Sequence, residues 1–377
     1  MIKKVLNHIV TYPTMGNLTY TRGLGSSLGI FLALQIVTGL LLATHFIPDV
    51  QQAFMSVEHI MRDVSWGWLL RYGHANGASF IFILMYGHMA RGLYHQSFRY
   101  PRSAVWYSGV TIFILMAGTA FLGSVLPWGQ MSFWAATVIT NILSVVPVIG
   151  SFLVVWIWGG FAVGTATLVR FYVLHFLLPF VVAGLAVLHI LLLHQTGSSN
   201  PKGANGTSKE AVRFSPYYFL KDVNMFLIVF FFYIAIVCWE PNLFGHPDNY
   251  IPADPLVTPA HIVPEWYFLP FYAILKGVPN KILGAVAMGA SMAALYALPY
   301  CQKERLTIKS YVAIYNFTVY RFVLNFLLLG WIGGQSPVEI YVALSYYVLT
   351  PIYFSFFVST WALTRLHRRV THVPHVE

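Results

Sequence analysis

The chain has 377 residues, of which 58% are hydrophobic, 17% are aromatic and only 9% are charged. So few charged residues exclude a soluble globular protein, because a soluble protein covers its surface with them. The formal net charge is +10 at pH 7, but the basic residues lie mainly in short loops between apolar runs, which argues against nucleic-acid binding. The composition therefore predicts an all-α, polytopic membrane protein.

Eight apolar runs in the chain are long enough to cross a bilayer. In order, they are expected at about residues 24–46, 71–91, 105–126, 170–195, 223–239, 282–301, 322–333 with some residues before it, and 340–363. Two shorter runs after the third span, residues 131–143 and 154–164, are rich in tryptophan or interrupted by glycine. These two runs are expected to lie at the membrane interface rather than to cross it.

The second and fourth spans each carry two histidines with the same spacing. His74 and His88 are 14 residues apart, and so are His175 and His189. Fourteen residues make almost four helical turns, so each pair lies on one helix face with about 21 Å between its members. An imidazole in hydrocarbon is costly unless it is bonded, and neutral imidazole is a good iron ligand. Two facing helices would therefore hold two stacked bis-histidine haems, whereas satisfied core histidines are the alternative.

Glycines in the first and third spans repeat this spacing. Gly25 and Gly39 are 14 residues apart, and so are Gly109 and Gly123. Glycine allows a flat macrocycle to approach the backbone closely, which suits a haem between these helices. Ordinary close packing of helices is the alternative explanation.

The distribution of charge predicts the topology. Of the 22 Lys and Arg residues, 17 lie in the N-terminal segment, in the loops after the second, fourth and sixth spans, or in the C-terminal segment. The positive-inside rule then places both termini on the positive side. The long loop at residues 240–281, which contains Pro264-Glu265-Trp266-Tyr267, is expected to be irregular and functional.

Several segments resemble the mitochondrial cytochrome b family, which forms the haem-bearing core of ubiquinol–cytochrome c oxidoreductase (complex III). The matching segments are GSSLGIFLALQIVTGLLLATH, RYGHANGAS, LPWGQMSFWAATVITN, HQTGSSNP and PEWYFLPFYAILKGVPNK, and the resemblance covers almost the whole chain. It implies eight transmembrane helices, of which the first four form a di-haem four-helix bundle within residues 1–209. Residues 210–377 would form a C-terminal part of four spans that contains the Pro-Glu-Trp-Tyr loop.

The resemblance also implies roles for the residues of the haem sites. His74 and His175 would ligate the lower-potential haem, and His88 and His189 the higher-potential haem nearer the matrix. The four glycines would contact the haems. Arg71 and Arg91 would pair with the haem propionates, for which a guanidinium is well suited, although both could instead snorkel to the interface.

Two quinone sites follow from the same resemblance. The outer site, where quinol is oxidised, would be formed by Phe121, Gly129, Ala135, Ile139, Pro264, Glu265 and Tyr267. Glu265 is expected to accept a quinol proton, because a carboxylate at the edge of an apolar pocket can bind a proton and turn toward water. The inner site, where quinone is reduced, would use His194, Ser198, Lys221 and Asp222.

The chain departs from the family's usual pattern at several positions. Ala135 stands where the family usually has glycine, so we expect weak inhibition by methoxyacrylate-class compounds. Ser124 replaces a usual tyrosine, which puts the family's route for proton exit in doubt. Arg22 and Gly23 replace Trp-Asn and Gln195 replaces glutamate, so the inner-site contacts are less secure.

The function implied is transfer of electrons from the outer site through two b-type haems to the inner site, coupled to proton translocation. Expected partners are a Rieske iron–sulfur protein, a c-type cytochrome, other complex III subunits, membrane lipid and a second copy of the chain. The expected location is the mitochondrial inner membrane, with both termini on the matrix side. The alternatives are a transmembrane di-haem reductase, either metal-reducing or ascorbate-dependent, and a proton-coupled transporter whose histidines relay protons.

Overall fold

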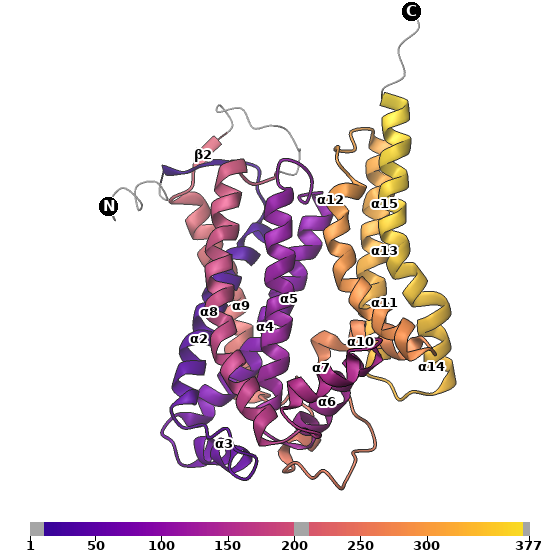
Figure 1. Ribbon diagram of the computed structural model, residues 1–377. Helices are drawn as coiled ribbons and strands as arrows, with labels where there is room; N and C mark the ends of the chain where they lie inside the picture. Colours follow the sequence, from indigo (N-terminus) through magenta and orange to yellow (C-terminus); the bar gives the residue numbers. More distant parts are fainter. Residues whose placement is uncertain (1–10, 200–210, 372–377) are drawn as a thin grey trace, which may run out of the picture.

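The computed structural model describes residues 11–199 and 211–371. Within these residues the chain is mostly helical, apart from an antiparallel pair of short strands, β1 (Pro13–Met15) and β2 (Ala211–Arg213), in which Thr14 is opposite Val212. Figure 1 shows the strands and the last turn of α15 (Thr350–Thr371) at one end of the molecule, the upper end. The opposite, lower end carries the short helices α3 (Ala53–Arg62) and α6 (Gln130–Asn141).

The first four long helices pack together as a four-helix bundle. They are α2 (Leu24–Ala43), α4 (Gly67–Tyr94), α5 (Ser103–Val125) and α8 (Thr165–Thr196). Helix α2 packs along α4 and helix α5 along α8, while α2 also contacts α8. The last of them, α8, stops at Gly197, whose φ of +68° is strained for any residue with a side chain.

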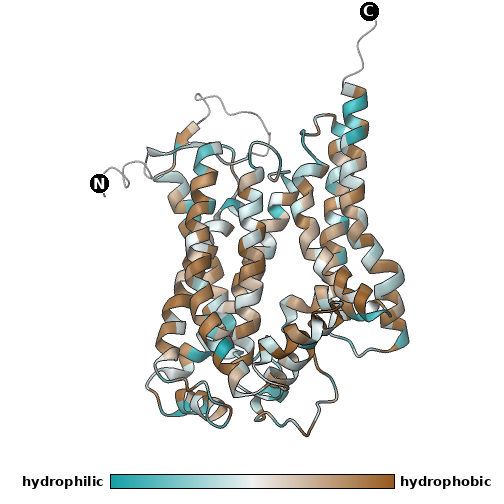
Figure 2. Ribbon diagram, viewed as in Figure 1, coloured by the Kyte–Doolittle hydropathy of each residue, from teal (hydrophilic) through white to brown (hydrophobic). Residues whose placement is uncertain are grey.

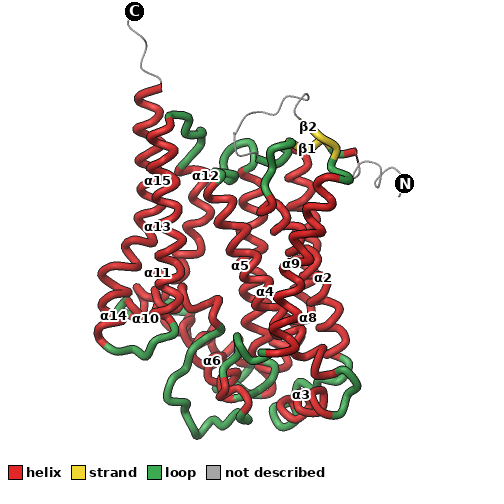
Figure 3. Tube along the Cα trace, turned by 180° about the vertical axis from the view of Figure 1, so that it is seen from behind, coloured by secondary structure: helices red, strands yellow, loops and turns green. Residues whose placement is uncertain are grey.

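The helices from residue 281 to residue 371 lie on one side of this bundle, as the views from the front and from behind agree (Figures 1 and 3). Helix α9 (Tyr217–Trp239) packs against α2 and α4, whereas α13 (Lys309–Gly333) packs against α15. The other elements of this part are α11 (Lys281–Ala293), η6 (Ala294–Ala297), α12 (Leu298–Cys301), α14 (Glu339–Leu344) and η7 (Ser345–Leu349).

Seven helical segments of the described residues are long and apolar enough to cross a membrane. They are Tyr20–Ala43, Ser103–Val125, Thr165–Thr196, Tyr217–Trp239, Lys281–Cys301, Lys309–Gly333 and Glu339–Thr371. Figure 2 shows apolar residues along the lengths of these helices and polar residues gathered in the end loops. Helix α4 is long enough but carries two arginines, two histidines and an asparagine, so the count of eight spans stays a prediction.

The lower end is formed by short helices and by the loop that follows α9. Helices α6 and α7 (Gly150–Trp158) correspond in sequence to the two runs expected at the membrane interface. Helix α7 begins four residues before the expected run and stops at Gly159, where φ is +72°. Residues 47–70 contain α3, which was not predicted as a helix.

The expectation that residues 240–281 are irregular was wrong in part. This segment contains η4 (Pro247–Tyr250), η5 (Trp266–Phe268) and the nine-residue helix α10 (Leu269–Gly277). Pro270 does not break α10, because it occupies the first turn, where the backbone N–H needs no helical partner. Lys276 joins α10 to α13 by donating hydrogen bonds to the carbonyls of Ile332, Gly333 and Gln335.

Candidate functional site

The four histidines of the bundle face each other in two pairs. The ring centres of His74 and His175 are 6.2 Å apart, and those of His88 and His189 are 6.4 Å apart. Two imidazoles on opposite sides of one metal ion, each with a nitrogen about 2.0 Å from it, would have ring centres about 6 Å apart. The spacing of both pairs therefore fits a single metal ion between the rings. We call them the lower pair (His74 and His175) and the upper pair (His88 and His189).

Each of the four glycines lies against one imidazole of these pairs. A Cβ atom added at Gly39 would be 3.0 Å from Cε1 of His74, and one at Gly25 would be 3.1 Å from Cε1 of His88. On the other two helices, Gly109 faces His189 and Gly123 faces His175 in the same way. The absence of a side chain at these positions therefore leaves room for the imidazole rings, and contact with a macrocycle remains a prediction.

Hydrogen bonds at Nδ1 orient three of the four imidazoles. His175 Nδ1 lies 2.8 Å from the backbone carbonyl of Thr119, and a carbonyl can only accept, so this nitrogen carries the proton. His74 Nδ1 lies 2.9 Å from the Thr38 hydroxyl, which donates its own proton to the Leu34 carbonyl. In each case Nε2 is left with a free lone pair, as a metal ligand requires.

The third of these hydrogen bonds is made by Ser108 to His189. Its hydroxyl donates to the Val105 carbonyl at 2.9 Å and therefore accepts from His189 Nδ1 at 2.8 Å. Sequence reasoning missed Thr38, Ser108 and Thr119, because a hydroxyl or a carbonyl on a neighbouring helix leaves no pattern within the histidine helices.

Two buried polar atoms near the upper pair have no hydrogen-bond partner among the described residues. They are His88 Nδ1 and Arg91 Nε. A buried guanidinium without a carboxylate is costly, so Arg91 fits a site that receives an acidic group such as a propionate. Among residues 11–199 and 211–371, no three His, Cys, Asp or Glu side chains gather as a metal site, so each histidine pair would be the whole protein ligand set. Two imidazoles and a nearby guanidinium fit a bis-histidine haem better than a zinc site, which takes three or four protein ligands.

A cavity of about 530 Å³ joins the lower pair to the loop that follows α9. Its lining includes His74, His175, Arg71 and Glu265. Burial raises the pKa of Glu265 to about 7, although the positive charge of Arg71 acts in the opposite direction. A carboxyl group with this pKa exchanges a proton readily near neutral pH, so the cavity contains a suitable proton acceptor.

Most of the residues predicted for the outer site lie together beside this cavity. A small hollow is lined by Phe121, Ala135, Ile139, Pro264 and Glu265, together with Ser124. Tyr267 lines the large cavity instead, where its ring stacks on Phe82 with the ring centres 4.0 Å apart. Gly129 lies outside both linings, and a Cβ there would be 2.5 Å from Oδ1 of Asn249. A side chain at Gly129 would therefore press against the loop at Asn249, and the role of Gly129 in the outer site stays a prediction.

The residues predicted for the inner site lie at the upper end, on α8, α9 and the segment that follows α8. His194 stacks on Tyr12, with the ring centres 4.7 Å apart. Lys221 and Asp222 are adjacent in sequence but make different contacts, since Lys221 Nζ lies over the Tyr217 ring and Asp222 bonds to Arg22. The Ser198 carbonyl accepts a hydrogen bond from Arg102. Tyr12 and Arg102 were not predicted for this site, whereas Arg22 was noted only as a departure from the family's pattern there.

Comparisons with known proteins agree on one family. The family model described as "Cytochrome b/b6/petB" matches residues 9–197, and the one described as "Cytochrome b(C-terminal)/b6/petD" matches residues 252–354. The chain is 53% identical over 333 residues to a protein named cytochrome b from Phytophthora megasperma, covering 88% of this chain and 86% of that protein. It is 50% identical over 370 residues to cytochrome b of Solanum tuberosum, covering 98% and 94%.

A solved structure has the same fold over almost its whole length. This structure, described as "Hyperthermophilic respiratory Complex III", superposes with a TM-score of 0.91 and covers 97% of both chains at 30% sequence identity. The agreement therefore extends over the histidine bundle, the loop after α9 and the helices that follow it.

Proposed function

Because the chain belongs to the cytochrome b family and is the quinol-oxidising electron-transfer subunit of respiratory complex III, we propose that its two histidine pairs each hold one b-type haem. The observation that carries this proposal is the geometry of the pairs, whose ring centres are 6.2 and 6.4 Å apart with a glycine opposite every ring. Each haem, when bound, would supply a carrier of one electron.

We assign the outer quinol site to the cavity that contains Glu265. Quinol gives up two electrons and two protons when it is oxidised, and Glu265 would accept one of these protons in its carboxylate form. The small hollow beside it, lined by Phe121, Ala135 and Ile139, would supply apolar contacts to the quinol. Tyr267, stacked on Phe82, and the backbone of Pro264 would keep this loop in position.

The inner quinone site is assigned to the upper end of the bundle. The quinone would be bound there, and supplied with protons, by His194, Ser198, Lys221 and Asp222. Quinol oxidation and quinone reduction would then take place at opposite ends of one chain. Residues 1–209 would then form the haem-binding part. Residues 210–377 would supply the Glu265 loop and the four further spans.

As an integral membrane protein of the respiratory chain, the subunit works with other complex III subunits. We infer that these include a Rieske iron–sulfur protein and a c-type cytochrome, and that the complex contains two copies of this chain. We place the subunit in the mitochondrial inner membrane, with both termini on the matrix side. The excess of Lys and Arg in the loops of one side supports this orientation.

A redox titration of the purified protein, followed by its visible difference spectrum, tests the haem assignment. Two b-type transitions at separate potentials are expected, and substitution of His74 should alter only the lower-potential one. A preparation in which the folded protein has no haem absorbance would instead favour the transporter, whose histidines relay protons.

A further inference from the structure

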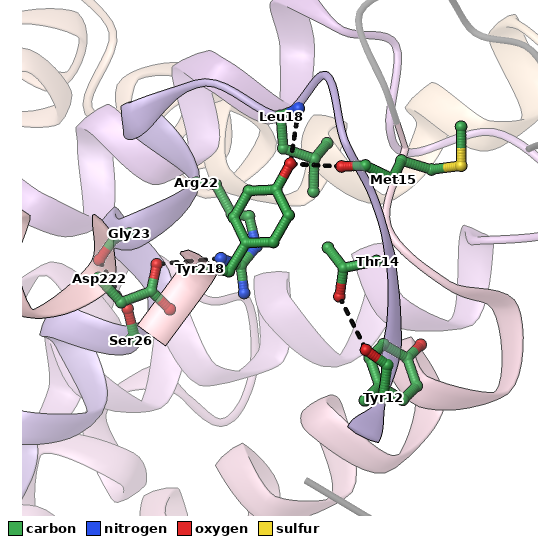
Figure 4. Close-up of polar contacts among 9 residues, drawn as sticks. All are labelled: Tyr12, Thr14, Met15, Leu18, Arg22, Gly23, Ser26, Tyr218 and Asp222. Carbon is green, nitrogen blue, oxygen red and sulfur yellow. Dashed lines mark hydrogen bonds and ion pairs between the residues drawn. The ribbon is translucent and has the colours of Figure 1, made fainter. Parts of the chain in front are cut away.

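Arg22 and Asp222 form an ion pair between parts of the chain that are 200 residues apart. Arg22 Nη1 lies 3.1 Å from Asp222 Oδ1, and the two side chains are 19% and 15% exposed. In every other ion pair among the described residues, both partners are at least 34% exposed. Figure 4 shows Arg22 reaching from the N-terminal segment to Asp222 on α9. This pair is therefore the one that is largely shielded from solvent.

The guanidinium of Arg22 is held in place by aromatic rings. Its carbon lies 4.7 Å from the centre of the Tyr218 ring and 5.0 Å from that of Phe214. The Tyr218 ring is itself fixed, because its hydroxyl donates to the Met15 carbonyl and accepts from the Leu18 N–H at 3.2 Å (Figure 4). Arg22 thus has a defined position before any ligand binds.

Structural stability alone gives little reason for this arrangement. Removing two charges from water costs about as much as their attraction returns, so a buried ion pair adds little net stability compared with apolar side chains of similar size. Among the described residues, the guanidinium makes its one hydrogen bond to Asp222, although an arginine has five N–H donors. Donors therefore remain for a further acceptor.

The surroundings of Arg22 carry an excess of positive charge. Gly25, three residues after Arg22, lies against the His88 imidazole of the upper pair. The charge of Arg22 also acts on Arg91, whose Nε has no partner among the described residues. Two guanidinium groups and one Asp222 carboxylate leave a net charge of about +1 in a partly buried region, which favours binding of an anion.

We propose that Arg22 is an anion-stabilising residue of the inner quinone site. This inference rests on the proposed location of that site. Reduction of quinone to quinol takes two electrons and two protons, and the first electron gives a radical anion before any proton is bound. The electrons come from the electron-transfer reaction of the subunit, and the protons come from water at the upper end. A guanidinium keeps its proton at any physiological pH, so Arg22 stabilises the anion without protonating it.

The test uses membranes that contain the assembled complex, with the outer site blocked by an inhibitor. The variants are Arg22→Gln, which removes the charge, and Arg22→Lys, which keeps it. Arg213→Gln is the matched control, because it removes an exposed positive charge from β2 at the same end. Electron paramagnetic resonance at a series of poised potentials gives the amount of quinone radical, and the visible spectrum gives the haem content.

The radical in Arg22→Gln should fall about tenfold relative to the unmodified chain, the size of effect expected when one nearby charge is lost. Arg22→Lys should retain at least about a third of the radical, and the control should retain all of it. If Arg22→Gln does not assemble, Arg22→Met is a second neutral variant whose stem can still pack on Tyr218.

Two results would overturn the inference about Arg22. One is an undiminished radical in Arg22→Gln at normal haem content, which would leave the ion pair as a structural link only. The other is an equal loss in Arg22→Gln and Arg22→Lys, which would show that charge is not the cause. If the proposed inner site itself is wrong, the result is different. The unmodified complex would then show neither a quinone radical nor reduction of a b-type haem by quinol when the outer site is blocked.

Discussion

Glu265 at the lower end and Asp222 at the upper end are two carboxylates placed near proposed quinone sites, but their surroundings differ. Glu265 lines an apolar cavity, and burial raises its pKa to about 7. Asp222 instead forms an ion pair with Arg22, in which 3.1 Å separates the carboxylate from the guanidinium. Burial thus prepares one carboxylate to take up a proton near neutral pH, whereas pairing fixes the other beside a cation. This contrast suits removal of protons from quinol at one end and stabilisation of an anion at the other.

The histidine pairs differ in a related way. The lower pair shares its cavity with Glu265 and Arg71, so a quinol bound there would lie next to the lower haem site. The upper pair adjoins Arg91, whose Nε has no partner among the described residues. The two ends of one bundle therefore present similar ligand pairs in different electrostatic environments, and substitutions at matched positions can separate their roles.

The largest effect is expected from loss of a proposed haem ligand. His175→Leu should remove the lower-potential b-type component and His189→Leu the higher-potential one, each lowering quinol-dependent electron transfer by at least about 100-fold. Difference spectra during a redox titration would measure both. Simultaneous loss of the two components in either variant, with the protein still folded, would contradict independent sites.

The next effect in size concerns Glu265. Glu265→Gln should slow quinol oxidation about 100-fold, because glutamine cannot accept the proton. Since the pKa of Glu265 is raised to about 7, the accepting carboxylate is present above pH 7 and is lost as the pH falls below it. Steady-state rates between pH 5.5 and about 8.5 should therefore rise with pH in the unmodified chain and lose this rise in the variant.

Glu240→Gln is the matched control for that experiment, because Glu240 is exposed at the end of α9. It should keep the rate and the pH profile of the unmodified chain. An unchanged pH profile in Glu265→Gln would show that another group accepts the proton, and Glu265 would then have only a structural role.

A smaller effect, on stability, is expected from the glycines. A Cβ at Gly123 would be 2.8 Å from His175 Nδ1, whereas a Cβ at Gly109 would be 3.2 Å from His189 Cε1. Gly123→Ala should therefore destabilise the protein by about 1–3 kcal/mol and Gly109→Ala by less. Thermal loss of haem absorbance measures the difference. Gly118→Ala is the control, since nothing lies within 4 Å of a Cβ there, and equal effects at all three positions would refute the steric argument.

The smallest effect is expected at Ala135, which lines the hollow beside Glu265. Ala135→Gly removes one methyl group and should increase inhibition by methoxyacrylate-class compounds about tenfold, the usual worth of one methyl group in an apolar pocket. The concentration for half-inhibition measures it. Ala136→Gly, a buried position outside this hollow, should leave that concentration unchanged. Strong inhibition of the unmodified chain would contradict the prediction.

Much of the helical framework could be predicted from the sequence. Hydropathy and helical period are local properties, so the majority of the predicted span ends lie within a few residues of the helix ends in the structure. The equal 14-residue spacings predicted that the histidines of α4 and α8 would meet, because that spacing fixes both the face and the height of each residue on its helix. The helix α10 was missed, since a proline-rich segment looks irregular until Pro270 is placed in a first helical turn.

The sequence by itself therefore determined the membrane-spanning helices, the heights of the four histidines and the resemblance to one family. Only the tertiary structure decided which groups orient those histidines, because the hydroxyls of Thr38 and Ser108 meet them across helix interfaces whose rotation depends on packing. It alone also decided that Arg22 meets Asp222. Residues 200 positions apart carry no local signal of contact, and their meeting depends on how the N-terminal segment and α9 pack at the upper end.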